Sequence, residues 1–175
     1  MSDLTFSQLD TSCDAQVEKY ERTLFKSLYT GPSPVASLIW DVDKANRRLR
    51  SKIPYQNRTI IVGMLNDSIV TGASINTTNN EPWQCDLLGF QIDKCESGIC
   101  EGSALFSTLM FYNSQLVALE MKRFMDVYMK KSNITKIYGN CRSKLLKGYM
   151  NLGWKLIGTK EIDDIVENLI YYTVT

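Results

Sequence analysis

Histidine is absent from the 175 residues of this chain. Catalysis by a Ser-His-Asp triad or by a Cys-His pair is therefore excluded. Most hydrolytic zinc sites are excluded as well, because they depend on imidazole ligands. Any proton transfer has to use a carboxylate, a tyrosine, a cysteine, a lysine or water.

The chain also lacks an excess of charge of either sign, because 20 basic and 19 acidic residues leave a net charge of +1. No overall field therefore draws it to nucleic acid or to an anionic membrane. The basic runs at 47–50 and 130–131 are typical of solvated helix faces or ends. No apolar run approaches the roughly 18 residues that span a bilayer, and residues 1–6 lack the pattern of a signal peptide. We expect neither a nucleic-acid partner nor a membrane span.

Cysteine is present in an odd number and without a Cys-x-x-Cys pair. This usage is typical of reduced thiols inside a cell, and none of the usual zinc-ligand spacings occurs. The sequence therefore predicts a cytoplasmic protein without a metal. The cysteines are Cys13, Cys85, Cys95, Cys100 and Cys141.

The N-terminal half combines helical and strand periodicity. Apolar residues at helical spacing predict a helix over 13–30, and a second helix is expected over 37–50. Two β-rich runs, 59–65 and 68–75, are joined by Asn66-Asp67, which predicts a β-hairpin. Residues 85–92 are expected to form a short strand or an ordered loop.

The C-terminal half predicts alternating strands and helices. The first strand does not alternate cleanly, which indicates a buried central strand with a bulge at Gly102. The elements expected are strand 99–110, helix 113–131, strand 135–140, helix 143–152, strand 154–159 and strand 167–175.

The segment 136–159 carries the most specific motif. Its helix bears Tyr149, Gly153 ends that helix, and Trp154 opens the next strand. This Tyr-x-x-x-Gly-aromatic ending resembles the last strand-helix-strand unit of the GNAT superfamily of N-acyltransferases. The resemblance implies that Tyr149 protonates the departing thiolate of the acyl carrier. The alternative is that Tyr149 only packs between helix and sheet.

A second resemblance lies in the middle of the chain. Residues 72–90 and 99–106 are similar to acyl-homoserine-lactone synthases and long-chain N-acyl amino acid synthases, with Glu101 matching the glutamate of a shared strand motif. The arginine expected three residues later is Ala104, and another is replaced within 73–75. These departures argue against lactone production from S-adenosylmethionine.

The resemblance also implies where substrates bind. The pantetheine arm is expected between strands 99–110 and 135–140, with a backbone N–H near Gly102 or Ser103 stabilising the oxyanion. Glu101 is the candidate general base, because burial in a partly apolar cleft raises a carboxylate pKa. Its alternative role is a bond to a neighbouring loop. For Cys100 and Cys141, buried structural thiols are expected rather than an acyl-cysteine intermediate, because no histidine is present to activate them.

Further candidate ligands lie where a strand gives way to a helix. Asn140 and Arg142 are expected to bind donor or acceptor. The turn before helix 113–131 contains no glycine, so phosphate binding there depends on helix N-terminal amides. The candidates are Asn113, Ser114 and Gln115.

We therefore expect one α/β domain over residues 1–175, with a GNAT-like mixed, mostly antiparallel sheet flanked by helices. The expected function is transfer of an acyl group from an acyl-CoA or acyl-carrier-protein thioester to a small-molecule amine. Such a donor is already activated, and the enzyme mainly has to position the amine. The alternative is a catalytically inactive GNAT-fold protein that acts as a binding or regulatory partner. A homodimer is left open.

Overall fold

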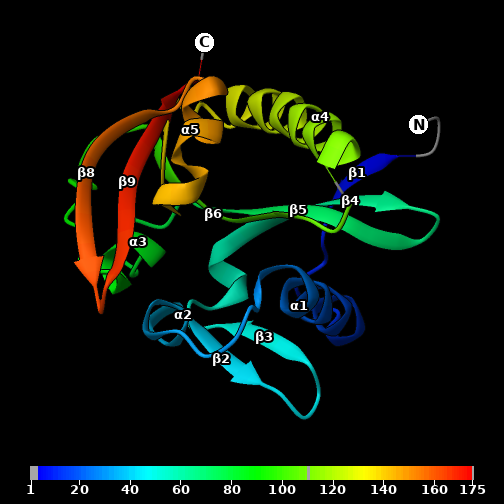
Figure 1. Ribbon diagram of the computed structural model, residues 1–175. Coiled ribbons are helices and arrows are strands. Elements are labelled where there is room, and N and C mark those ends of the chain that lie inside the picture. Colours follow the sequence, from blue (N-terminus) through cyan, green and yellow to red (C-terminus); the bar gives the residue numbers. More distant parts are fainter. Residues whose placement is uncertain (1–3, 110, 175) are drawn as a thin grey trace.

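The computed structural model describes residues 4–109 and 111–174, and for 111–116 only the backbone (Figure 1). In this part of the chain, seven strands form one sheet in the order β1-β4-β5-β6-β7-β9-β8. Every neighbouring pair is antiparallel except β6 and β7. The sheet is therefore mixed and mostly antiparallel, as predicted. Its strands are β1 (Thr5–Gln8), β4 (Arg58–Leu65), β5 (Ser68–Asn76), β6 (Ile99–Ser107), β7 (Lys136–Arg142), β8 (Lys155–Ile162) and β9 (Ile165–Thr173).

The remaining elements cover the two faces of the sheet (Figure 1). One face carries the long helix α4 and the short α5, and the other carries α1, α2, α3 and a separate hairpin formed by β2 and β3. No helix in the described ranges is long and apolar enough to cross a membrane. The bounds are α1 (Asp14–Leu28), α2 (Pro34–Ile39), β2 (Trp40–Asp43), β3 (Arg48–Ser51), η1 (Tyr55–Asn57), α3 (Gln84–Leu87), α4 (Phe111–Lys131) and α5 (Ser143–Asn151).

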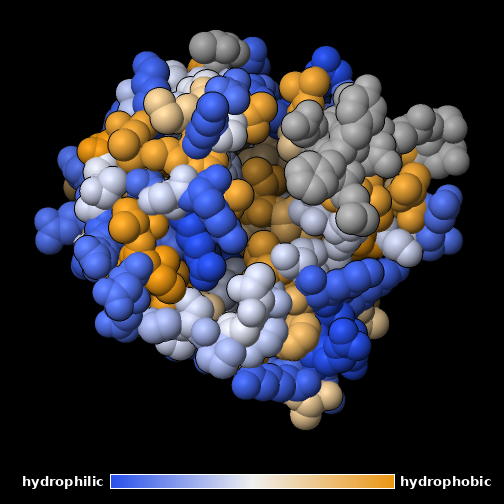
Figure 2. Space-filling view, in the orientation of Figure 1, coloured by the Kyte–Doolittle hydropathy of each residue, from blue (hydrophilic) through white to orange (hydrophobic). Residues whose placement is uncertain are grey.

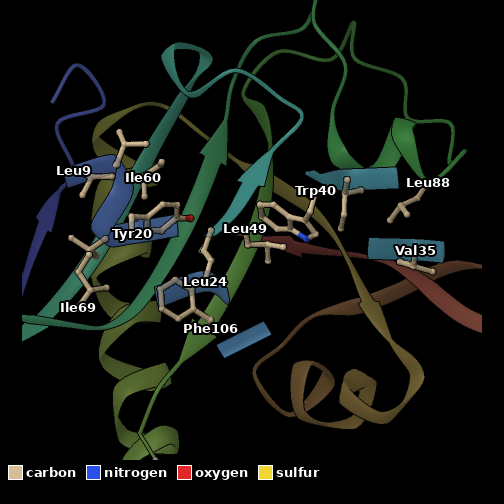
Figure 3. Packing of buried hydrophobic residues seen from close by; sticks show 13 residues of the cluster. Leu9, Tyr20, Leu24, Val35, Trp40, Leu49, Ile60, Ile69, Leu88 and Phe106 are labelled. Atoms are coloured by element: carbon tan, nitrogen blue, oxygen red, sulfur yellow. The ribbon is translucent and has the colours of Figure 1, made fainter. Parts of the chain in front are cut away.

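Each face of the sheet has its own hydrophobic core. On the α1 face, the helical stripe of Tyr20 and Leu24 packs with Phe106 of β6 (Figure 3). On the α4 face, Met121 and Met129 pack against the other side of the same strands. Apolar residues at alternate strand positions supply both cores, because successive side chains of a strand point to opposite faces.

The predicted helix over 37–50 is wrong. Helix α2 ends at Ile39, and the following residues form the β2–β3 hairpin. The backbone N–H of Asn46 donates to Asp43 Oδ1 at 3.0 Å and closes the turn. In β3 only Leu49 is buried, and it lies between two arginines, which is the two-residue period of a strand.

Contacts with α1 fix this hairpin in place. The side chain of Glu21 is 2% exposed and accepts hydrogen bonds from Arg48 Nε at 2.7 Å and from the Tyr55 hydroxyl at 2.9 Å. A buried carboxylate needs such partners. The hairpin therefore depends on residues far away in the sequence, and it forms one wall near the site described below.

Three smaller features differ from the sequence prediction. Strand β1 was not predicted and pairs with the edge of β4. The segment expected as a strand or loop over 85–92 begins with the helical turn α3. The irregularity of β6 lies at Ala104, which has a φ of 53°, rather than at Gly102. The β4–β5 hairpin is confirmed, with left-handed φ values at Asn66 and Asp67.

Candidate active site

The parallel strands β6 and β7 pair over three positions only. The last of these joins Glu101 to Tyr138, and beyond it the two strands separate. After Glu101, the backbone N–H and C=O groups of β6 on this side therefore form no β-sheet hydrogen bonds with β7. The resemblance leads us to expect the pantetheine arm between these two strands, and the structure has a separation there.

A cavity of about 460 Å³ occupies this separation. Residues 102–107 of β6 and 139–142 of β7 line it, together with parts of α4, α5 and the segment from α1 to β2. The lining comes from both faces of the sheet, so the cavity passes between the strands from one face to the other. Figure 2 shows a hollow with hydrophobic side chains at its floor.

The α4 side of the cavity contains a row of apolar side chains. Met121, Met125 and Met129 follow one another along α4 at four-residue spacing, and all three line the cavity. Trp154 and Ile137 line it from the sheet side. An apolar wall of this kind favours a hydrocarbon group of a ligand.

Tyr149 projects from α5 into this part of the cavity. Its ring packs edge-on against Trp154, with 5.6 Å between the ring centroids. Burial raises the pKa of the Tyr149 hydroxyl to about 12, and the Cys141 thiol beside it adds to this shift. The hydroxyl therefore stays protonated near neutral pH and can act as a proton donor but not as a base.

Glu101 is 1% exposed and is absent from the described cavity lining. Its two carboxylate oxygens accept the backbone N–H groups of Gln84 and Cys85, each at 2.7 Å. Burial raises the pKa of Glu101, although these hydrogen bonds lower it. This geometry favours the alternative interpretation, in which Glu101 anchors a neighbouring segment, here the first turn of α3.

A chain of hydrogen bonds runs from α3 to the cavity. Gln84 Nε2 donates to Asn140 Oδ1 at 2.8 Å, and Asn140 Nδ2 donates to Glu167 Oε2 at 2.8 Å. Arg142 Nε lies 3.7 Å from the other oxygen of Glu167. All four side chains line the cavity. The structure thus brings the predicted Asn140 and Arg142 together around a carboxylate that the sequence analysis did not single out.

Glu167 lies in β9, opposite Arg142 of β7. It is 2% exposed, and burial raises its pKa, while the Asn140 hydrogen bond and Arg142 lower it. One sequence signal could have identified it, namely a lone acidic residue within the apolar run 165–170. Its position beside Asn140 could not be read from local sequence, because it follows from strand pairing.

The other predicted residues fall into three groups. Gly102 and Ser103 line the cavity, and Ser103 Oγ has no hydrogen-bond partner among the described residues. The thiols of Cys100 and Cys141 are buried, and burial raises their pKa values to about 12 and about 11, so they are not thiolates near neutral pH. Asn113, Ser114 and Gln115 fall within the first turns of α4, but their side chains lie outside the described residues.

The described residues contain no group of three or more acidic or cysteine side chains arranged to hold a metal ion. The groups that line the site or lie beside it are a tyrosine hydroxyl, a carboxylate, amides, a guanidinium and backbone N–H groups.

No family model and no curated protein sequence matches this chain. Solved structures do. The AHL synthase LasI has a TM-score of 0.77 at 10% identity, over 98% of this chain and 89% of that chain. The CoA-dependent acyl-homoserine lactone synthase BjaI, solved with SAM and isopentyl-CoA, has a TM-score of 0.76 at 9% identity, over 98% and 84%. A probable acetyltransferase from Staphylococcus epidermidis has a TM-score of 0.65 at 14% identity, over 98% and 99%.

These similarities establish the fold. The chain shares the GNAT-like fold of these solved structures at 9–14% sequence identity. The predicted fold class is confirmed.

Proposed function

We propose that this protein is an N-acyltransferase that moves an acyl group from a thioester to a small-molecule amine. The observation that carries the proposal is the cavity through the sheet, with the protonated Tyr149 on one face and the buried Glu167 on the other. The solved acyl-homoserine lactone synthases and the probable acetyltransferase of similar fold support the same reaction class.

The donor enters from the α4–α5 face in this proposal. Its pantetheine arm lies along the separated backbones of β6 and β7. A backbone N–H of Gly102 or Ser103 stabilises the oxyanion, which is the role that fixed donors play in acyl transfer. Tyr149 then protonates the departing thiolate. The free N–H groups in the first turn of α4, which begins at Phe111 and includes Asn113, hold the phosphate, because the helix dipole favours negative charge there.

The cavity suits an acyl group longer than acetyl. The methionines of α4 provide an apolar wall beside the point where the thioester would lie. Methionine side chains adapt to ligands of irregular shape. Lys122 lines the same side and is paired with Asp126 and the Tyr172 hydroxyl, so its charge is compensated within the protein. Acyl-CoA and acyl-carrier protein present the same pantetheine arm, and either can be the donor.

Glu101 acts as a positioning residue in this account. It fixes the first turn of α3, and through Gln84 it fixes the amide of Asn140. Asn140 and Arg142 then face the acceptor side of the cavity. Both oxygens of Glu101 are bonded to backbone N–H groups, and it is absent from the described cavity lining, so it is not placed to take a proton from the acceptor.

The test is a turnover assay on the purified full chain. Acetyl-CoA, octanoyl-CoA and octanoyl-carrier protein are each incubated with a pool of primary amines, and free thiol and new amide masses are measured. We expect thiol release that depends on an amine, with an N-octanoyl product and a lower rate for acetyl-CoA. Thiol release without any amide product, or no release with any donor, would contradict the proposal.

A catalytically inactive binding protein is the second candidate. The observations that favour it are Ala104, where the resemblance leads one to expect an arginine, and the fully bonded carboxylate of Glu101. A binding protein would take up a donor in a titration and release no thiol under the same conditions. The turnover assay therefore separates the two candidates.

A further inference from the structure

Glu167 faces the cavity from the side of the sheet opposite to Tyr149. In β9, Asn168 and Tyr172 point toward α5, since Asn168 Nδ2 donates to Ser143 Oγ at 3.2 Å and the Tyr172 ring packs with Trp154. Glu167 precedes Asn168 and therefore points to the other face, where it meets Asn140. The two groups reach one cavity from its two ends.

The carboxylate of Glu167 has unused hydrogen-bonding capacity. One oxygen accepts a hydrogen bond from Asn140 Nδ2 at 2.8 Å. The other lies 3.7 Å from Arg142 Nε, which is beyond hydrogen-bond length. No other described residue donates to this group. A carboxylate can accept about four hydrogen bonds, and this one lines the cavity, where a ligand can donate to it. A ligand donor fits this deficit.

Two other carboxylates near the site are placed differently from Glu167, although Asp126 Oδ1 also has no hydrogen-bond partner among the described residues. Both oxygens of Glu101 are bonded to the backbone of α3, and Glu101 does not line the cavity among the described residues. Asp126 lines the cavity on the α4 face, where Lys122 Nζ lies 2.7 Å from it. It therefore lies on the proposed donor side and already has a cationic partner.

We infer that Glu167 receives the ammonium group of the acceptor and takes its proton, an assignment that rests on the proposed acyl transfer. The proton moves from R–NH₃⁺ to the carboxylate, and the freed lone pair forms the C–N bond to the thioester carbon. The C–S bond then breaks, and the thiolate takes the Tyr149 proton. The second proton of the nitrogen restores the tyrosine, and Glu167 returns its proton to water. The products are an amide, a thiol and one proton.

The neighbours of Glu167 keep its basicity moderate. Arg142 from β7 lowers the pKa, and burial raises it by more. The thiols of Cys85 and Cys141, whose pKa values Glu167 helps to raise, are neutral and add no charge near it. Lys160, opposite it on β8, lies on the same face of the sheet, and its Nζ donates to the carbonyl oxygen of Gly89 at 3.2 Å. Activity should therefore fall as the pH drops through the raised pKa of Glu167.

The kinetic test compares Glu167→Gln with Glu161→Gln, an exposed change in the same β8–β9 hairpin. Glu167→Gln should lower kcat/KM by about 10²-fold or more and remove the acidic limb of the pH profile. Glu161→Gln should leave both unchanged. An active wild type whose Glu167→Gln variant keeps its rate and its acidic limb overturns the inference and leaves the acyltransferase function standing.

A second measurement does not depend on turnover. The ¹³C carboxyl signal of Glu167, assigned by its absence from Glu167→Gln, is followed while n-butylammonium chloride is added to the wild type. We expect a saturable shift of this signal and a lower pKa for the group, because a bound cation stabilises the carboxylate. A carboxyl signal that does not respond overturns the inference even if acyl transfer is found. If no amine is acylated but the signal responds, the proposed function fails and the ammonium site stands.

Discussion

Gly139 of β7 and Gly102 of β6 approach each other where the two strands begin to separate. A Cβ built on Gly139 would lie 2.9 Å from the carbonyl oxygen of Gly102, and a Cβ on Gly102 would lie 2.6 Å from Ile137 Cδ1. The ring of Trp154 is 3.5 Å from the same Gly139 position. The two strands can approach this closely because both positions are glycine. We call the narrow point between Gly102 and Gly139, where the cavity begins, the neck.

Gly139→Ala should narrow this neck. The new methyl group meets a backbone carbonyl, which cannot rotate away as a flexible side chain can. We expect a loss of about 1–3 kcal/mol in the free energy of unfolding, as for other overpacked sites. Urea denaturation measures this loss directly.

Gly148→Ala provides the matched control. Gly148 lies inside α5, and nothing lies within 4 Å of its Cβ position. Alanine in a helix interior should stabilise the protein by about 0.5–1 kcal/mol. If Gly139→Ala is as stable as wild type, the strands can move apart to make room for the methyl group. Close packing at the neck would then not require a glycine.

Tyr149→Phe removes only the hydroxyl group. The edge-on contact with Trp154 remains, so the melting temperature should change little. Turnover should fall by about 10²-fold, because the thiolate loses its proton donor. The hydroxyl pKa of about 12 predicts that ionisation of this group does not lower the wild-type rate between pH 7 and 10.

Tyr171→Phe is the control for this variant. Tyr171 lies on β9 outside the described cavity lining, so its change to Phe should keep full activity. A fully active Tyr149→Phe would assign Tyr149 to packing alone.

Glu101→Gln tests the anchoring of α3. In the wild type, each carboxylate oxygen accepts a hydrogen bond of 2.7 Å from a backbone N–H, one from Gln84 and one from Cys85. A glutamine keeps only one acceptor oxygen. Its NH₂ group then faces the other backbone N–H, so two donors meet. A buried donor without an acceptor costs about 1–3 kcal/mol, and this loss should appear in urea denaturation. Glu96→Gln, at the exposed pair with Lys136, should change stability by less than about 0.5 kcal/mol. Equal stability of the two variants would contradict the anchoring role.

Glu167 should make stability depend on pH in a defined direction. Burial raises its folded pKa above the ordinary value of 4.5, so the folded state holds this proton more tightly than the unfolded state. Its favourable contribution is complete below pH 4.5 and is lost as the pH rises through the folded pKa. Compared with Glu167→Gln, the wild type should therefore lose stability from pH 4.5 upward. Unfolding curves recorded from pH 4 to 8 decide this, and parallel curves for the two proteins would refute it.

Features fixed by neighbouring residues could be predicted from the sequence. The β4–β5 hairpin depends on the turn at Asn66 and Asp67, where both φ values are positive. The end of α5 depends on Gly153, which has a φ of 92°. In both places the local conformational preference agrees with the final fold. The β4–β5 hairpin, the end of α5 and the position of Tyr149 on that helix therefore follow from local patterns.

Features fixed by distant partners could not be predicted. The β2–β3 hairpin depends on the ion pair between Arg48 and Glu21 of α1, and α3 depends on Glu101 of β6. Glu167 becomes a candidate site residue only because β9 pairs with β7 and places it beside Asn140. Strand register and burial create these relationships, and neither is visible in a short window of sequence.

Donor binding at the neck is the most direct test of the account. Thermal unfolding of wild type and Gly139→Ala is followed with octanoyl-CoA and with octanoyl-carrier protein. A donor at 100 times its Kd should add about 2.7 kcal/mol, a rise of several degrees in Tm. We expect this rise for wild type with at least one donor, and a much smaller rise for Gly139→Ala. Equal shifts in both proteins, or no shift with either donor in the wild type, would contradict a thioester site between β6 and β7.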